Sequence, residues 1–381
     1  MCGRTCLTLD PNQIICACKY KTTKSVDKTN CKTKEQEANT KQIKETDSSY
    51  LSPEWRPEFN CGRKFISSYN VAPTDITPVL VSTDHFSEDN NGDYQSRVLV
   101  PMMWGMIPFW HKGDYRKHGL STNNCRLEHM LSSKLYRGPF RRGQRCVVLC
   151  EGFYEWQTTK TTKPSERAAF LIHMPQKEGI IIYDKTTWIE NINLLKMAGL
   201  FDVWEDDNGD KIYSYSVITF ESSSKFNWMH HRMPAILENE QQINDWLDFK
   251  RVTDEQALNT LQPAKEIIWY QVSNLVNNSR NKSDQCNKPI DLAQKQKLPA
   301  PSSNKTLLSW LNVRKRREDC LASENEEKES NDSEDEGKEI QMPKRQKFSD
   351  YKKTLTKVDL FTDDEKKDVC DENSAKAENN K

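Results

Sequence analysis

Short apolar runs recur between residue 69 and about residue 281, and this pattern predicts β-strands. The runs are a few residues long, rich in β-branched and aromatic side chains, and bounded by turn-forming residues. We predict strands at residues 79–81, 98–100, 146–150, 180–183, 198–204, 213–220 and 267–272. Between two of them, Asn208-Gly209 predicts a hairpin with a type I′ turn, because both central residues of that turn need positive φ.

Helical patterns are fewer. Thr253 and Gln256 have the spacing of a capping box and predict a helix that continues through Leu261. Residues 243–247 predict another short helix. Many short strands with few helices favour an α+β fold built mainly on antiparallel sheet.

Two long segments lack the apolar residues that a core needs. Residues from about 20 to 50 are rich in Lys, Thr, Asn, Gln and Glu, and we expect a polar, disordered insertion there. After about residue 295 the chain becomes strongly acidic, over residues 318–340, and then basic. We therefore expect one ordered domain over residues 2–295 and a disordered tail over residues 296–381.

The tail contains short features that suggest partners. Basic clusters at residues 314–317 and 344–347 have the composition of nuclear import signals, although such clusters also solvate a tail. An apolar island at residues 307–311 predicts a short docking helix, or a last turn that packs on the domain.

Composition excludes several classes of protein. Among 381 residues, 56 basic and 56 acidic side chains cancel, so the net charge does not select a partner. Apolar runs are too short for a membrane span, and the polar residues after Met1 argue against a secretory leader. The 12 cysteines include no CxxC pair, so we expect reduced thiols, no metal and no cofactor.

Cys2 is the strongest candidate for chemistry. Removal of Met1, which aminopeptidases carry out before a small residue, would leave a cysteine with a free α-amino group. That amine has a pKa of about 7.7–8.0, far below that of lysine, and a thiol lies beside it. The pair can capture an aldehyde, because the amine forms an imine and the thiolate then closes a thiazolidine ring. The thiol can also attack an acyl group with its own amine as the base.

Two polar clusters later in the chain suit proton transfer. Glu155 lies between two aromatic residues at a strand end, where burial would raise its pKa, although a surface position on an edge strand is the ordinary alternative. His230 and His231 beside Arg232 suit phosphate binding or acid–base chemistry, although one histidine can be structural.

Two further clusters suit nucleic acid. Asn124 and Arg126 offer an amide and a guanidinium that can bracket a sugar or a phosphate, if they are more than an ordinary polar loop. The irregular aromatic stretch 103–110 can stack against bases, or pack in the core as most tryptophans do. Basic residues are frequent just after it, which is compatible with a nucleic-acid backbone.

Six motifs then follow one another in a fixed order. They are Met1-Cys2-Gly3-Arg4, Asn70-Val71-Ala72-Pro73, Trp104-Gly105-Met106-Ile107-Pro108, Asn124-Cys125-Arg126, Glu151-Gly152-Phe153-Tyr154-Glu155-Trp156 and His230-His231-Arg232-Met233-Pro234. In this order they closely resemble the SRAP (SOS response-associated peptidase) family, in its eukaryotic branch, over residues 2 to about 290. The resemblance implies a single compact SRAP-type domain, mostly antiparallel β with a few helices, and a basic groove for single-stranded DNA.

The resemblance also implies roles for individual residues. Cys2 would crosslink to the ring-opened aldehyde of an abasic site, and Asn124 would position the opened sugar. Glu155 would transfer protons during ring closure and reversal, and His230 would lie near the sugar and its 3′ phosphate. Contacts with the DNA are implied for five more residues, namely Arg4, Arg126, Trp104, Asn70 and Arg232.

These roles predict a sensor and shield of abasic sites, in which a thiazolidine DNA–protein crosslink prevents strand breakage during replication. We expect a monomer in the nucleus at replication forks, with no membrane partner, and a tail that is a candidate for binding the sliding clamp or another fork protein. Two alternatives stay open. One is an N-terminal-nucleophile peptidase or amidohydrolase, and the other is a non-covalent reader of modified DNA bases.

Overall fold

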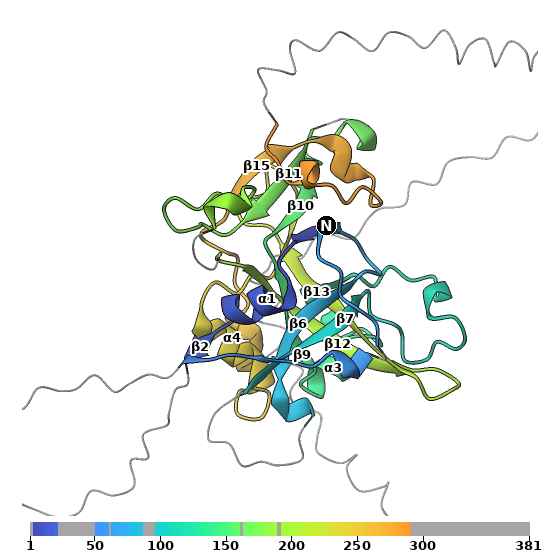
Figure 1. The fold of residues 1–381 in the computed structure, drawn as a ribbon. Coiled ribbons are helices and arrows are strands. Elements are labelled where there is room, and N and C mark those ends of the chain that lie inside the picture. Colours follow the sequence, from blue (N-terminus) through green and yellow to red (C-terminus); the bar gives the residue numbers. More distant parts are fainter. Residues whose placement is uncertain are drawn as a thin grey trace, which may run out of the picture. The chain divides into compact units, whose positions relative to one another are not determined.

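The apolar runs of the chain pair into two main sheets. The computed structural model describes residues 3–21, 50–60, 62–86, 96–160, 163–188 and 192–290. Within these ranges a five-stranded sheet has the order β15 (Ile268–Val272), β11 (Ala169–His173), β10 (Gly152–Trp156), β1 (Thr5–Leu7) and β5 (Ser68–Val71) (Figure 1). A small ladder joins β2 (Tyr20–Lys21) to β3 (Tyr50–Leu51).

The second sheet is larger and closes on itself. Its order is β14 (Arg232–Pro234), β13 (Lys211–Glu221), β12 (Leu195–Glu205), β9 (Arg145–Cys150), β6 (Ile76–Ser82), β7 (Arg97–Trp104) and β4 (Glu54–Trp55), with β8 (Asn124–Arg126) beside β13. Because β13 also pairs with β7, with Ser214 opposite Met103, the strands β13, β12, β9, β6 and β7 form a ring. Closure leaves these strands few open edges, and every residue of β7 is buried.

The stretch from β9 to β10 passes directly from the ring to the five-stranded sheet. Strand β9 belongs to the ring, Glu151 follows it, and β10 then runs in the five-stranded sheet. A Cβ on Gly152 would lie 2.6 Å from the carbonyl oxygen of Ile172, so only glycine fits at this bend. The position of Glu151 therefore couples the ring to the smaller sheet.

The five-stranded sheet buries both of its faces. Leu7, Phe153 and Ile172 pack into the main core with the ring strands. Residues at alternating positions, such as Cys6 and Tyr154, form a second apolar cluster with the segment that follows β15. Glu155 is two residues after Phe153 and so belongs to the face that packs toward the ring.

Short helices pack beside the strands. They are α1 (Pro11–Ala17), α2 (Leu127–Met130), α3 (Arg137–Arg141), α4 (Glu240–Leu247) and α5 (Asp254–Thr260), and 3₁₀ turns lie at η1 (Pro57–Asn60), η2 (Thr83–His85), η3 (Tyr115–Lys117), η4 (Pro164–Glu166), η5 (Lys185–Thr187), η6 (Asn274–Asn277) and η7 (Asp284–Cys286). Trp246 of α4 is buried and donates from Nε1 to the Cys146 carbonyl at 3.0 Å. Within the described ranges, no helix is long and apolar enough to cross a membrane.

The predicted α+β class, mostly β with few helices, is confirmed. The capping box of Thr253 and Gln256 opens α5, and residues 243–247 lie in α4, as predicted. Five of the seven predicted strands fall within observed strands, and the predicted strand 267–272 begins one residue before β15. The insertion at about 20–50 lies almost entirely outside the described residues, as does the tail 296–381.

Two local predictions are wrong. Residues 180–183 form a turn, not a strand, because the carbonyl of Ile181 accepts from Trp188 Nε1 at 3.0 Å and its N–H bonds to Thr187. The β12–β13 hairpin exists, but its turn is not type I′. Among the described residues near it, only Gly209 has positive φ, at 86°, and the loop is wider than two residues because Asp206 N–H donates to the Asp210 carbonyl.

Candidate functional site

The first described residues run alongside β10 toward Glu155. Thr5 lies opposite Phe153, and the N–H of Tyr154 donates to the Arg4 carbonyl at 2.9 Å. Continuing this antiparallel register by one residue brings Gly3 opposite Glu155. Cys2, the predicted nucleophile, lies outside the described residues.

Glu155 is a buried carboxylic acid. Its side chain is 2% exposed, and its Oε1 accepts the backbone N–H of Trp156 at 3.2 Å. Burial raises the pKa of Glu155, while the positive charge of the chain's amino terminus acts in the opposite direction. The group is therefore poised to hold a proton at a higher pH than an ordinary glutamate.

His230 approaches the end of β10 from another part of the chain. The N–H of Thr158, just beyond β10, donates to the Met229 carbonyl at 2.9 Å. His230 is 5% exposed, and its Nδ1 accepts the N–H of Arg232 at 3.0 Å. Burial, with added repulsion from the amino terminus, lowers the pKa of His230 to about 4. The imidazole is then neutral at pH 7, and its Nδ1 faces both the N–H and the carbonyl oxygen of Arg232, at 3.0 and 3.1 Å.

Asn124, Arg126 and Arg232 converge on strand β13. Strands β8 and β14 pair with opposite edges of β13, and Thr219 lies across from both Arg126 and Pro234. Asn124 is half-buried and Arg126 is exposed. The chain thus brings the Asn-Cys-Arg motif beside the histidine motif, although about a hundred residues separate them.

Arg232 is tied into the protein. It is 7% exposed, and its guanidinium binds both carboxylate oxygens of Glu128 at 2.5 and 3.0 Å. It also donates to the Thr219 carbonyl at 2.8 Å. The sequence analysis gave Glu128 no role. The only signal that could have identified it is its position shortly after Asn124 and Arg126 in the chain. In this arrangement Arg232 joins β14 to α2 across β13.

Arg4 and Asn70 form a second tied pair. Asn70 is fully buried, and its Nδ2 lies 2.9–3.2 Å from the carbonyls of Val276, Asn278 and Asn281. Arg4 donates to the Val276 carbonyl at 2.8 Å and to Asn70 Oδ1 at 3.3 Å. Both side chains therefore hold the segment after β15 against the N-terminal strand.

Trp104 and its neighbours divide into buried and exposed aromatics. Trp104 is 1% exposed and donates from Nε1 to the Asn123 carbonyl at 3.0 Å, directly before Asn124. Phe109 and Trp110 are 54% and 40% exposed, and Lys134 Nζ lies 5.8 and 4.8 Å from their ring centroids. The sequence marked the whole stretch, but only the fold distinguishes the aromatics that reach solvent.

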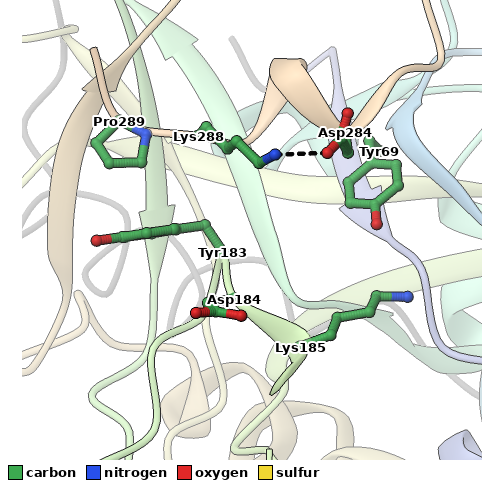
Figure 2. A pocket seen from close by; sticks show the side chains of 7 residues that line it. All are labelled: Tyr69, Tyr183, Asp184, Lys185, Asp284, Lys288 and Pro289. Carbon is green, nitrogen blue, oxygen red and sulfur yellow. Dashed lines mark hydrogen bonds and ion pairs between the residues drawn. The ribbon is translucent and has the colours of Figure 1, made fainter. Parts of the chain in front are cut away.

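The described part of the protein contains two hollows near the candidate site residues. One of about 260 Å³ lies beside Asn123 and is lined by Pro73, Thr74, Met103, Trp104, Gly105, Tyr115, Arg116, His118, Leu120, Ser121, Thr122 and Asn123. A more open one of about 540 Å³ is lined by Tyr69, Tyr183, Asp184, Lys185, Asp284, Lys288 and Pro289 (Figure 2). Its two lysines and two carboxylates balance in charge, and Lys288 is bound to Asp284 at 2.5 Å.

Sequence comparison finds relatives over most of the chain. The abasic site processing protein HMCES of Xenopus tropicalis is 39% identical over 316 residues, which are 82% of this chain and 85% of that protein. HMCES of Pongo abelii is 40% identical over 271 residues, 68% of this chain and 74% of that protein. The abasic site processing protein YoqW of Bacillus subtilis is 29% identical over 218 residues, 57% of this chain and 83% of that protein. A family model for the SOS response associated peptidase (SRAP) matches residues 1–279, and the chain therefore belongs to the SRAP family.

Proposed function

We propose that this protein processes abasic sites in DNA, and that it does so by trapping them on Cys2 in single-stranded DNA. The similar proteins named for abasic site processing support the first part. The observation that supports the second is that Glu155 and His230 are both buried near the end of β10, and that the charge of the amino terminus lowers the pKa of each.

The proposed reaction begins with the open aldehyde at C1′ of the abasic sugar. The Cys2 amine adds to the carbonyl carbon, and loss of water gives an imine. The Cys2 thiolate attacks the imine carbon, and the nitrogen takes up a proton, which closes the thiazolidine ring. One C–N bond and one C–S bond form, and one water leaves. Because C1′ is no longer a carbonyl, the acidity that drives β-elimination and strand breakage is lost.

The buried groups divide the proton transfers in this scheme. Glu155, with its raised pKa, donates a proton to the departing hydroxyl and accepts one from the attacking amine or thiol. His230 is neutral at pH 7 and would take part in proton transfer at the sugar oxygen or contact the 3′ phosphate through its ring. Asn124, on β8, would hold the opened sugar by its side-chain amide.

The DNA would bind over a surface with few base-reading groups. Arg126 and Lys134 supply positive charge for phosphates, and the exposed rings of Phe109 and Trp110 supply stacking surfaces for unpaired bases. Arg4, Asn70 and Arg232 are engaged inside the protein, so their part in DNA binding would be to shape this surface. Trp104 would act in the same way, by holding the chain before Asn124.

We further propose that the protein acts as a monomer in the nucleus at replication forks. The basic clusters at residues 314–317 and 344–347 would direct import, and residues 307–311 would dock on the sliding clamp or another fork protein. These segments lie outside the described residues. A pulldown with the full chain against Leu308→Ala and Trp310→Ala tests the docking, and equal clamp recovery from all three proteins contradicts it.

The experiment that tests the trapping is an intact-mass measurement. The purified full-length protein is mixed with a single-stranded oligonucleotide that carries one abasic site. We expect a species without Met1 that gains the oligonucleotide mass less one water, and no such species with Cys2→Ala. Cys2→Ser should give at most a labile adduct, because an oxazolidine is less stable than a thiazolidine.

The alternatives predict different results in the same experiment. A non-covalent reader of modified bases would bind the oligonucleotide equally well with Cys2→Ala and give no adduct. An N-terminal-nucleophile peptidase or amidohydrolase would lose Met1, form no DNA adduct, and form an acyl intermediate on Cys2 with an activated ester.

A further inference from the structure

Glu151, at the bend between β9 and β10, is buried beside the N-terminal strand. Its side chain is 1% exposed, and it accepts three hydrogen bonds from the N-terminal segment. Oε1 accepts from the Thr8 N–H at 2.5 Å and from the Thr8 hydroxyl at 2.6 Å, and Oε2 accepts from the Cys6 thiol at 3.2 Å. Its own N–H donates to the Cys6 carbonyl at 2.8 Å. These bonds hold the end of β1 at one fixed point.

Lys185 completes this clamp from the other side. Its Nζ donates to the Thr8 carbonyl at 3.1 Å, so both polar groups of the Thr8 backbone are bound by ionisable side chains. Lys185 also lines the hollow drawn in Figure 2, where its ammonium lies 5.6 Å from the Tyr69 ring centroid. The clamp thus gathers β1, β10 and η5 around one residue of the N-terminal segment.

Strand β10 begins next to this clamp and ends near Glu155, the candidate proton-transfer group. Glu151 precedes β10, and Glu155 lies near its end. β1 is antiparallel to β10, and a bulge between Thr5 and Leu7 disturbs its pairing with β5 on the other side. The bonds from Glu151 to Thr8 and Cys6 therefore add a fixed point to the register that the ladder pairs of β1 and β10 define. A slip of one residue would turn every side chain of β1 to the opposite face.

We propose that Glu151 is a positioning residue for the reaction at the amino terminus: it fixes β1 in register along β10 and so sets which residue lies opposite Glu155. This inference rests on the proposed function. Glu151 precedes β10 and Glu155 lies near its other end, so Glu151 acts through β1. The position of a nucleophile within about 1 Å governs rates by up to a hundredfold, so a looser strand lowers the rate more than it lowers DNA binding.

The test compares isosteric and conservative variants of the full chain. Glu151→Gln keeps the shape but loses one acceptor oxygen, and Glu151→Asp keeps both acceptors on a shorter stem. Asp202→Asn is the matched control, because Asp202 is also a buried strand carboxylate, 6% exposed, that binds Arg142 away from β1. Three quantities are measured for each: the crosslinking rate at saturating abasic DNA, the Kd for undamaged single-stranded DNA, and amide hydrogen exchange.

We expect Glu151→Gln to lower the saturating rate by about tenfold, with the Kd changed less than about twofold. Exchange should quicken at the Tyr154 amide, which donates to Arg4, and stay constant at the Ala198 amide, which donates to Ala235 in the ring. Glu151→Asp should retain more of the rate than Glu151→Gln, and Asp202→Asn should retain nearly all of it.

Several results would overturn the inference. One is a folded Glu151→Gln protein with wild-type rate and wild-type exchange at Tyr154. Another is an equal loss of rate in Glu151→Gln and Asp202→Asn, which would mean a general loss of stability. If the wild-type protein forms no crosslink, the proposed function fails, and unchanged exchange at Tyr154 in Glu151→Gln would then show separately that the clamp is wrong.

Discussion

The ring of β6, β7, β9, β12 and β13 and the five-stranded sheet handle buried charge in different ways. Around the ring, buried charged groups meet an opposite charge: Arg97 binds Glu240 at 2.9 Å, and Arg145 binds Asp254 at 2.6 Å. In the smaller sheet, Glu151 accepts bonds from uncharged donors, and burial raises the pKa of both Glu151 and Glu155. The ring therefore pairs its buried charges, while burial in the smaller sheet favours the protonated form of these two carboxyl groups.

The largest expected effect is on the ring. Trp104→Ala should lower the free energy of unfolding by about 3–5 kcal/mol, because it empties a buried site and removes the bond to the Asn123 carbonyl. Trp110→Ala is the control, since that ring is 40% exposed and its loss should change stability by less than about 0.5 kcal/mol. Urea denaturation measures both. An equal loss of unfolding free energy in the two variants would contradict the distinction between a buried Trp104 and an exposed Trp110.

The next effect is on chemistry in the smaller sheet. Glu155→Gln should slow crosslink formation, reversal or both by about a hundredfold, because the proton-transfer group is lost. The same substitution should also change how the free energy of unfolding depends on pH. The folded pKa of Glu155 is raised, so wild-type stability is full at low pH and falls as pH rises through that pKa, and the variant lacks this fall. Rates near wild type in both directions would remove Glu155 from the mechanism.

A smaller effect tests the tie between β14 and α2. Glu128→Gln should cost about 1–2 kcal/mol of unfolding free energy, because the buried guanidinium of Arg232 keeps its bond to Thr219 but loses a charged partner. The exposed pair of Arg56 and Glu58 is the comparison, and Glu58→Gln should change stability by less than about 0.5 kcal/mol. Thermal denaturation followed by circular dichroism measures these changes. Equal melting temperatures for Glu128→Gln and the wild type would contradict the prediction.

The effect that is smallest at neutral pH is that of a buried histidine, which changes stability only in acid. Burial lowers the pKa of His85 to about 4, and its ring stacks on Phe249 at 4.3 Å. A depressed histidine pKa adds stability above its unfolded value near 6.5, and this stability is lost as pH falls toward 4. His85→Phe keeps the stacking and should flatten the stability profile between those values, with crosslinking unchanged. Denaturation midpoints at a series of pH values check this, and a profile as steep as that of the wild type would contradict it.

Much of the fold could be predicted from the local sequence. Runs such as 146–150 and 213–220 were readable as strands because β-branched and aromatic residues pack on either face of a sheet wherever it lies. The box of Thr253 and Gln256 was readable because its bonds close within one turn. The prediction of a strand at residues 180–183 was wrong for the opposite reason: the bond that Ile181 accepts from Trp188 and the bond that it donates to Thr187 outweighed the apolar pattern.

The candidate site shows the same limit. The sequence alone determined which groups have unusual chemistry: a cysteine after Met1, a glutamate between aromatics and a histidine pair beside an arginine. Only the tertiary structure decided that Glu155 and His230 are buried, which arginines are bound to Glu128 or to the Val276 carbonyl, and which aromatics reach solvent. The reason is physical: the type of a side chain is local, whereas its burial, its pKa and its partners depend on strands that pair across a hundred or more residues.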